Sequence, residues 1–360
     1  MPDLRVIPVP GVPEVREDDD LAALLVTALR ARGADLEEGD VLVVSSKVVS
    51  KALGLWADGR DRSLAIAAQT MRTVAERRSE DRLTSVVEAV AGPVMAAAGV
   101  DASNTGDRDD VLVLPADPDA EAQRLREALL AATGLGRLGV VLSDTAGRPW
   151  RSGQTDFALG ASGVDVLDDL RGAVDADGRA LAVTARAVAD EIASAADLVK
   201  GKSDAVPAAV VRGTPWAGET HGAGARSLVR TGAGDWFALG HAEAVRSALG
   251  VRPGTEAARE VGIPSVAPES LAERIARAAA VALRECETAG VDVGRADGST
   301  GAGDDNAASL DLQVSAATPY ELGVVVARLQ VALWGEGIDA VVPTEAGGDS
   351  LTLRASHRIH

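Results

Sequence analysis

Polar and charged side chains gather in one short segment, residues 141–163, whose composition packing alone does not explain. It reads VLSDTAGRPWRSGQTDFALGASG. An apolar run that predicts a buried strand stops at Asp144 and Thr145, and a glycine-punctuated loop with Arg148 and Arg151 is expected to follow. A carboxylate and a hydroxyl can bind a hard cation, and guanidinium groups can bind phosphate in planar, bidentate contacts. The segment therefore predicts a site that handles phosphate together with a metal ion.

Three further polar clusters also follow runs that predict buried strands. They are Ser46 with Lys47 and Lys51, Asp101 with Asn104, and Lys200 with Lys202. Ligands bind at the carboxyl ends of strands in open sheets, because loops can converge there without breaking the sheet. We therefore expect the four clusters to meet at one site.

The chemistry of these clusters divides into oxygen ligands for a cation and cations for phosphate. Asp101 and Asp144 could share one or two Mg²⁺ or Mn²⁺ ions, and Thr145 could add its hydroxyl group. The lysines and arginines would then neutralise a polyphosphate. Metal plus polyphosphate is typical of phosphoryl or nucleotidyl transfer. The sequence contains neither a Walker A motif nor the protein-kinase motifs, so the nucleotide site would be of another kind.

Each cluster, taken alone, also has a purely structural interpretation. An aspartate after a strand, such as Asp101, commonly forms a turn or caps a helix. Lys47 and Lys51 lie four residues apart and could form a solvated helix face, while Lys200 could oppose a helix dipole. The functional interpretation depends on the clusters lying together.

Hydrophobic periodicity predicts an α/β (α+β) fold. We expect one domain over residues 1–245, a Pro- and Gly-rich linker over 246–267, and a small two-layer α/β module over 268–360. Within the first domain, helices are expected over residues 64–78 and 117–133. The second module contains no residue pattern typical of an active site.

Composition excludes several classes of function. The chain carries 54 Asp and Glu against 36 Lys and Arg, a net charge of −18, which repels phosphate backbones and argues against nucleic acid as a partner. Cys286 is the only cysteine in the sequence, so disulfide scaffolds and Cys-based zinc sites are excluded. No apolar run approaches the ~18 residues typical of a membrane span, and the N-terminus has no signal-peptide core. A cytoplasmic location without membrane contact is expected.

Four motifs in chain order give the sequence a family resemblance. They are GDVLVVSSKVVSKALG, AGVDASNTG, the 141–163 segment, and DLVKGKSDAVPAAVVRG. Together they resemble the coenzyme F420-0 γ-glutamyl ligases over about residues 5–240. The resemblance implies that family's own α/β fold and a homodimer. It also implies a GTP-dependent ligase with two divalent cations, Mg²⁺ or Mn²⁺, with K⁺ as a further cofactor to consider, and with F420-0 and L-glutamate as substrates.

The resemblance also implies roles for particular residues. Those expected to bind the nucleotide are Gly11, Val12, Pro13, Glu14, Ser46, Lys51, Asn104 and Gly222. Those expected to bind metal are Asp101, Asp144, Thr145 and, as a candidate for a remaining ligand, Glu219. Arg148 and Arg151 are expected to act in catalysis. GTP would phosphorylate a substrate carboxylate, and the amine of glutamate would then displace the phosphate, so catalysis would come mainly from positioning and charge neutralisation.

Two departures from the family pattern leave alternatives open. Members often read NAGVDASN, whereas this chain has Ala97 in place of the asparagine and so lacks an amide near the metal loop. The C-terminal module has no motif of the flavin-binding half of bifunctional relatives. A deazaflavin-binding protein without ligase activity, or a ligase that uses a different acceptor, are the alternative functions.

Overall fold

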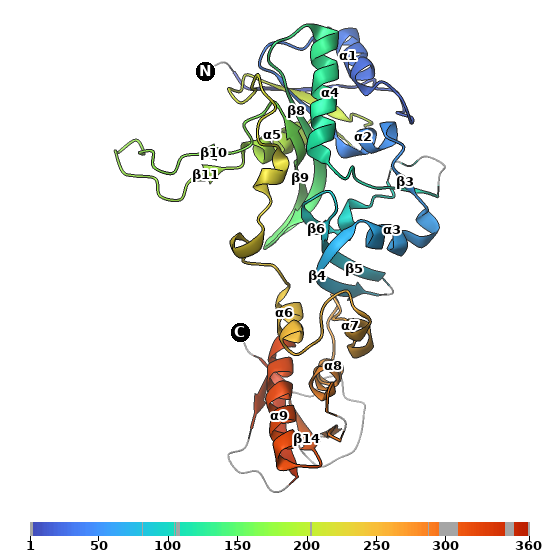
Figure 1. Ribbon diagram of the computed structural model, residues 1–360, viewed down its shortest axis with the longest axis vertical. Coiled ribbons are helices and arrows are strands. Elements are labelled where there is room, and N and C mark those ends of the chain that lie inside the picture. Colours follow the sequence, from blue (N-terminus) through green and yellow to red (C-terminus); the bar gives the residue numbers. More distant parts are fainter. Residues whose placement is uncertain are drawn as a thin grey trace. The chain divides into compact units, whose positions relative to one another are not determined.

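The computed structural model describes residues 3–80, 82–103, 105, 109–201, 204–286, 288–294, 309–342 and 349–358. These residues form two compact units (Figure 1). The first comprises Met1–Met71 and Val87–Asp235, and the second comprises Arg72–Val86 and Trp236–His360. Helices and strands are mixed in both units, which confirms the predicted α/β class.

A five-stranded sheet in the order β1-β12-β2-β8-β9 organises the first unit. Its strands are β1 (Arg5–Pro8), β12 (Ala208–Arg212), β2 (Val41–Ser45), β8 (Gly139–Arg148) and β9 (Arg151–Ser162). β2 and β8 are parallel, with Ser45 opposite Ser143, whereas the other neighbouring pairs are antiparallel. The central strands are apolar on both faces, as expected of strands covered on both sides.

Helices cover both faces of this sheet, which makes three layers. α1 (Leu21–Ala31) and α4 (Pro118–Thr133) pack on one face, where Leu42, Val140 and Leu142 are fully buried. α5 (Val188–Asp197) packs on the other face, against Val43 and Val141. Figure 1 shows α4 and α5 on either side of β8 and β9. Alternate side chains of each strand therefore enter different cores.

The remaining elements of the first unit are short, and several carry site residues. They are α2 (Ser46–Ala52), α3 (Arg62–Ala68), β3 (Trp56–Ala57), β6 (Val94–Ala96), β7 (Val111–Leu112), β10 (Asp168–Asp169), β11 (Ala185–Arg186), η1 (Gly59–Asp61), η2 (Ala97–Gly99), η3 (Ala225–Leu228) and η4 (Gly232–Gly234). β4 (Thr70–Ser79) and β5 (Arg82–Ala89) form a hairpin, and residues 72–86 of it belong to the second unit.

Two local predictions were wrong. The helix expected over residues 64–78 ends at Ala68, and β4 follows, because β-branched residues such as Thr70, Thr73 and Val74 fit a paired strand well. The loop expected after residue 145 is instead a long hairpin of β8 and β9 that turns between Arg148 and Arg151. Gly147 lies where the pairing of β8 with β9 is irregular, because the register of the two strands shifts between Gly147 and Arg148.

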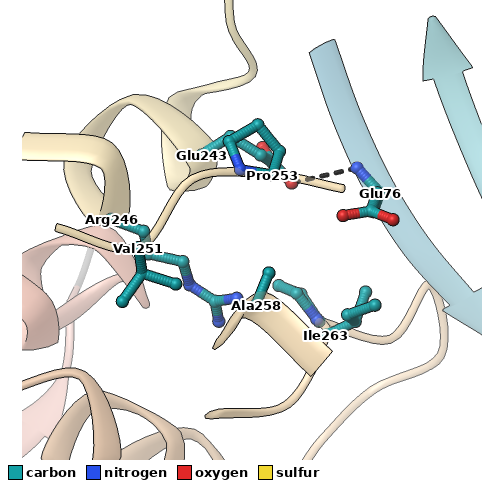
Figure 2. A pocket seen from close by; sticks show the side chains of 8 residues that line it. Glu76, Glu243, Arg246, Val251, Pro253, Ala258 and Ile263 are labelled. Atoms are coloured by element: carbon teal, nitrogen blue, oxygen red, sulfur yellow. Dashed lines mark hydrogen bonds between the residues drawn. The ribbon is translucent and has the colours of Figure 1, made fainter. Parts of the chain in front are cut away.

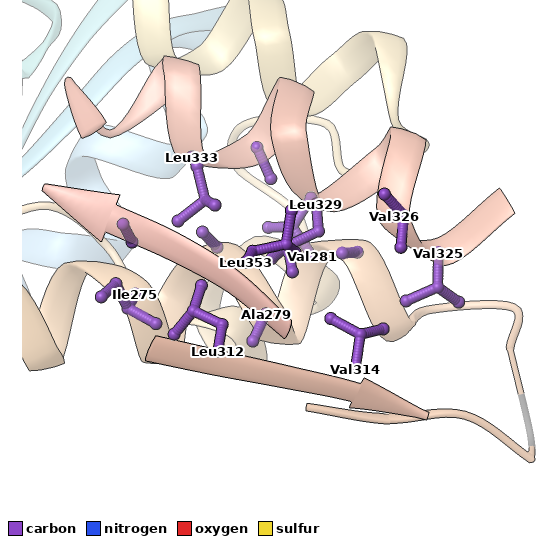
Figure 3. Packing of buried hydrophobic residues seen from close by; sticks show 14 of the residues in the cluster. Ile275, Ala279, Val281, Leu312, Val314, Val325, Val326, Leu329, Leu333 and Leu353 are labelled. Carbon is purple, nitrogen blue, oxygen red and sulfur yellow. The ribbon is translucent and has the colours of Figure 1, made fainter. Parts of the chain in front are cut away.

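The second unit is a two-layer α/β structure. Its four-stranded antiparallel sheet has the order β13-β14-β16-β15. The strands are β13 (Gly290–Gly294), β14 (Ser309–Ser315), β16 (Ser350–His357) and β15 (Ile338–Val341), and the helices are α6 (His241–Ala248), α7 (Glu256–Val261), α8 (Leu271–Leu283) and α9 (Pro319–Gly335). Figure 3 shows Leu312, Val314 and Leu353 of the sheet meeting Leu329 and Leu333 of α9.

Residues 246–267, expected as a linker, are part of the core of this unit. Four apolar residues of this segment are buried there: Leu249, Val251, Ala258 and Val261. The Pro and Gly residues between them in the sequence made the segment resemble a linker. The compact units divide between Asp235 and Trp236 rather than near residue 245.

Buried polar contacts also tie the hairpin segment 72–86 to the C-terminal part of the second unit. The backbone N–H of Glu76 donates to Oε1 of Glu243 at 3.1 Å, beside a small cavity lined by Arg246 (Figure 2). The backbone N–H of Gly254 donates to Oε2 of Glu76 at 2.7 Å. Arg246 also pairs with Glu336 at 2.6 Å. The backbone groups and the Arg246–Glu336 pair are satisfied inside this core, whereas Oε2 of Glu243 has no hydrogen-bond partner among the described residues.

Candidate functional site

One edge of the five-stranded sheet gathers the predicted clusters. β2 and β8 are parallel, so their carboxyl ends, at Ser45 and Ser143, lie side by side. β12 runs antiparallel to β2, so the segment that precedes it, with Lys200, arrives at the same edge. β1 also ends there, since the N–H of Val9 donates to the carbonyl of Ala208 at 2.9 Å. The order of strands therefore brings together segments that are far apart in the sequence.

A pocket opens at this edge. Its polar lining includes Lys47, Lys51, Lys200, Thr145 and Asp156. Apolar side chains and the Gly11–Glu14 loop complete the wall, through Val12, Pro13, Glu14, Val48 and Val206. Three lysines line this concave site together with three carboxylates, Glu14, Asp156 and Asp197, and the lysines are the groups suited to bind an anionic ligand.

A buried ion pair forms the floor of the pocket. Lys200 Nζ lies 2.6 Å from Oδ2 of Asp156, and both side chains are 6% exposed. Asp156 also accepts hydrogen bonds from the hydroxyl groups of Ser143 at 2.9 Å and Thr145 at 2.7 Å. Burial opposes ionisation of Asp156, but Lys200 and these hydroxyl groups outweigh it and lower the pKa of the carboxyl group. The Thr145 hydroxyl proton is engaged by Asp156, so its lone pairs remain available to a ligand.

Asp101 is held beside this pocket by a backbone bridge and by Lys47. Its N–H donates to the carbonyl of Leu112 at 3.0 Å, and its carbonyl accepts from the N–H of Leu112 at 2.8 Å. Its carboxylate pairs with Lys47 at 2.6 Å and accepts the N–H of Ser103 at 2.7 Å. Burial opposes its ionisation, but these hydrogen bonds prevail and lower the pKa of Asp101. Asp101 is therefore an anchored carboxylate.

Asp144 lies close to two other carboxylates. The protein atoms packed around its carboxyl group, and then the negative charges of Asp101 and Asp156, raise its pKa to about 6. Such an excess of negative charge is what a divalent cation would relieve, and carboxylate and hydroxyl oxygens are ligands that Mg²⁺ and Mn²⁺ accept. Asp101, Asp144 and Thr145 thus fit a hard cation. Within the described residues no group of three His, Cys, Asp or Glu side chains could hold a metal, so water or substrate oxygens would complete the coordination.

Most of the described residues expected to bind nucleotide line this pocket or adjoin it, namely Gly11–Glu14, Ser46 and Lys51. Lys51 is buried and pairs with Glu14 at 2.5 Å, while the Glu14 side chain is 70% exposed. Ser46 at the start of α2 is buried, and its hydroxyl group has no hydrogen-bond partner in the described part of the chain. Gly11 adopts a φ of 80°, which lets the loop turn toward the pocket.

Other predicted residues are not brought to this pocket within one chain. Glu219 and Gly222 belong to a loop that docks at the far end of the β8–β9 hairpin, where the N–H of Gly218 donates to the carbonyl of Gly163. Ser162, beside Gly163, pairs with Val140, four residues before Asp144, which is about 13 Å along a strand. The Glu219 carboxylate is therefore remote from Asp144 in the same chain.

The two predicted catalytic arginines occupy the tip of the β8–β9 hairpin. Arg148 and Arg151 face each other across the turn, and both are exposed. Trp150 between them is 82% exposed with a φ of 60°. Asn104 and Lys202 lie outside the described residues.

Asp156 is the residue of the pocket that the sequence-based site prediction missed. It lies in β9 on the same face as Ala158, which is buried. A carboxylate in alternation with buried residues must have a charged or hydrogen-bonding partner, because an unpaired buried charge is very costly. This period-two pattern is the signal that could have identified it.

The departure at Ala97 has a structural consequence that can be tested. Ala97 and Ala98 adopt φ values of 52° and 53°, a left-handed conformation that costs an alanine about 1–2 kcal/mol and that asparagine tolerates better. We expect Ala97→Asn to raise the free energy of unfolding by about 0.5–1 kcal/mol, measured by denaturant unfolding. Ala98→Asn is the matched control and should destabilise the protein, because Ala98 is 1% exposed and an amide would be buried there. Equal effects at both positions would contradict this explanation.

Fold and site together define an α/β protein with a lysine-rich ligand pocket at a sheet edge and carboxylates suited to a cation. Comparison with known proteins makes this specific. The sequence model of the F420-0:Gamma-glutamyl ligase family matches residues 11–213, and the chain belongs to this family of ligase enzymes. Those residues include β2, β8, β9 and β12 and all the lysines of the pocket.

Archaeal relatives match most of their own length. The coenzyme F420:L-glutamate ligase of Archaeoglobus fulgidus is 42% identical over 231 residues, which is 60% of this chain and 90% of that protein. The ligase of the same name from Methanothermobacter thermautotrophicus is 38% identical over 247 residues, 63% of this chain and 96% of that protein. A third, from Methanopyrus kandleri, is 42% identical over 232 residues, 59% of this chain and 88% of that protein.

None of the helices in the described residues is both long enough and apolar enough to cross a membrane.

Proposed function

We propose that this enzyme is a GTP-dependent coenzyme F420-0:L-glutamate ligase that adds one or more γ-linked glutamates through an acyl phosphate. Its cofactors would be two divalent cations, Mg²⁺ or Mn²⁺, and its working form a homodimer. Family membership and the names of the archaeal relatives support the substrates. The observation that carries the proposal is the meeting of Lys47, Lys51 and Lys200 in one pocket beside Asp101 and Asp144.

The reaction needs an activated acid, because a free carboxylate is a poor electrophile. A carboxylate oxygen of F420-0 attacks the γ-phosphorus of GTP, the bond to the β-phosphate oxygen breaks, and GDP leaves. The amine nitrogen of L-glutamate then attacks the acyl carbon, inorganic phosphate leaves with the electrons of the C–O bond, and the amine loses a proton. When bound, the divalent cations supply neutralisation of phosphate charge.

The residues of the pocket are suited to bind and orient these groups. Lys51 is buried, but its present partner Glu14 is largely exposed and can move aside, which frees the ammonium group for a phosphate. Thr145 is held by Asp156 with its lone pairs available and would bind one cation, while Asp101 and Asp144 would bind the other. Charge neutralisation by prearranged groups commonly contributes most of the rate enhancement in such reactions.

Purified protein incubated with F420-0, GTP, L-glutamate and Mg²⁺ or Mn²⁺ should yield products heavier by whole glutamyl units in mass spectrometry, with one GDP formed per glutamate. Omission of the metal by chelation, or replacement of GTP by ATP, should reduce product formation. A matched reaction with L-aspartate tests the acceptor. Absence of product with both metals would contradict the proposal.

Two other outcomes would indicate the alternative functions. Binding of F420 without GTP consumption would indicate a deazaflavin-binding protein. Product formation only with another amino acid would indicate a different acceptor.

A further inference from the structure

A bulge in β9 decides on which face of the sheet Asp156 lies. The pairing of β9 with β8 shifts at Leu159, which is an extra residue on β9 without an opposite residue in β8. In this register Asp156 lies opposite Thr145 and on the same face. Without the extra residue, Asp156 would lie opposite Ala146, on the face that carries Asp144. The contacts of Asp156 in the pocket therefore depend on the bulge.

Two polar side chains of α5 bind the backbone of β9 beside this bulge. Oδ1 of Asp190 accepts a hydrogen bond from the N–H of Ala158 at 2.9 Å. About one helical turn later, the Ser194 hydroxyl group donates to the carbonyl of Asp156 at 2.8 Å. Buried backbone donors and acceptors require such partners. The two contacts therefore hold residues 156–158 of β9 on α5.

The same helix also positions Lys200, the partner of Asp156 in the buried ion pair. The N–H of Lys200 donates to the carbonyl of Ala196 at 3.1 Å, which attaches this lysine to the last turn of α5. Ala189 and Ala193 are fully buried, and their small side chains let α5 lie close to the sheet. One helix thus places both partners of the ion pair.

The hydrogen bond from Ala158 requires an acceptor at position 190 but no charge. Burial raises the pKa of Asp190, against the opposing effect of the Ala158 N–H. The amide oxygen of an asparagine can accept the same hydrogen bond. Glu191 is also acidic and lies in the same first turn of α5, but it is exposed. It therefore shares with Asp190 the interaction with the helix dipole and serves as a control for it.

We propose that Asp190 is a positioning residue, which fixes the bulge of β9 and thereby turns Asp156 into the pocket. Ser194 supports the same segment from the next turn of α5. Asp156 in turn orients the Thr145 hydroxyl group and holds Lys200. The expected effect on catalysis rests on the proposed function, whereas the expected effect on the ion pair does not.

Acetylation of lysine side chains, followed by mass spectrometry, tests the ion pair without any reaction of the enzyme. Burial and its partner protect Lys200, so Asp190→Ala should raise its acetylation rate at least about tenfold. Lys47 is the internal reference, because it pairs with Asp101 and its rate should not change. Asp190→Asn should keep the rate at Lys200 within about threefold of that in the unchanged protein. Glu191→Ala should leave this rate unchanged.

The ligase assay gives a second readout. Asp190→Ala should raise the half-saturating Mn²⁺ concentration at least about tenfold, with the KM for L-glutamate unchanged, because Asp156 no longer orients the Thr145 hydroxyl group. Asp190→Asn should restore the original concentration. A chain that forms no product would contradict the ligase proposal alone, since acetylation at Lys200 still decides the role of Asp190.

Ser194→Ala tests the same contact with a milder change, because it removes one hydrogen bond and leaves Asp190 in place. It should raise acetylation of Lys200 about threefold. Unchanged acetylation of Lys200 in folded Asp190→Ala and Ser194→Ala would overturn the proposal. Equal acceleration at Lys47 and Lys200, or an Asp190→Asn variant acetylated as fast as Asp190→Ala, would overturn it as well.

Discussion

Asp144→Asn should lower the rate of glutamate addition at least about 100-fold while the protein stays folded, because the variant removes a charge that neutral amide oxygen cannot replace at a cation. Exposed Asp165 offers a matched control, and Asp165→Asn should keep full activity. The measurement is product formation by mass spectrometry under saturating GTP and metal. Retention of activity within tenfold of the unchanged enzyme would rule out a role for the Asp144 carboxylate at a metal.

The same variant should be more stable than the unchanged protein in chelator near pH 7. The pKa of Asp144 is raised from 3.8 to about 6 by burial and by Asp101 and Asp156. The folded state therefore binds the proton more tightly than the unfolded state, so stability falls as pH rises from about 4 to about 6 and stays low above that. Asparagine does not titrate, so the variant should gain about 1–3 kcal/mol relative to Asp144 at neutral pH. Melting temperatures measured across this pH range should diverge as pH rises, and a constant difference would contradict the raised pKa.

Lys200→Met should destabilise the first unit by about 3–5 kcal/mol at pH 7, because it leaves the carboxylate of Asp156 buried without its partner. Asp156→Asn in the same background should recover most of this loss, since an amide carries no charge, its oxygen can accept from the hydroxyl group of Thr145 and its NH2 group can donate to the hydroxyl group of Ser143. Hydrogen exchange of the β8 and β9 amides reports the change locally, without interference from the second unit.

The pH dependence gives a further check on the same pair. Asp156 has a lowered pKa, so its contribution to stability is present above 3.8, its value in the unfolded chain, and is lost as pH falls through the folded value. The penalty of Lys200→Met should therefore be largest at neutral pH and shrink in acid. Lys200→Arg serves as the control that keeps the charge. A double variant no more stable than Lys200→Met would show that the ion pair is not the cause.

The expectation that polar clusters at strand ends meet at one edge of the sheet holds for strands that are neighbours in the sheet. Lys47 and Asp144 follow β2 and β8, and because these strands are parallel neighbours, their ends meet. Lys200 joins them because β12 is antiparallel to β2 and begins at that edge. Each cluster can be identified in the sequence. The order and direction of the strands bring the clusters to the same edge of the sheet.

Other features depended on pairing partners that the sequence does not reveal. Residues 70–79 have a helix-compatible apolar spacing, yet they form β4 because β5 is available to pair with them. Asp156 was missed because the segment after Thr145 was expected to be a loop. In a loop, the alternation of apolar and polar side chains does not indicate which of them are buried. The remote position of Glu219 follows from the docking of its loop at Gly163, a long-range contact without a local signal.

The second unit is discontinuous along the chain, and this constrains how the protein can form. Residues 72–86 leave the ribosome well before the residues that receive them, among them Glu243 and Gly254. During synthesis Glu76 and Arg77 of this hairpin stay in water until their partners in the second unit have been made. Assembly of this unit therefore cannot finish until β16 has been synthesised, so folding of the second unit cannot be completed when its first residues, 72–86, are made.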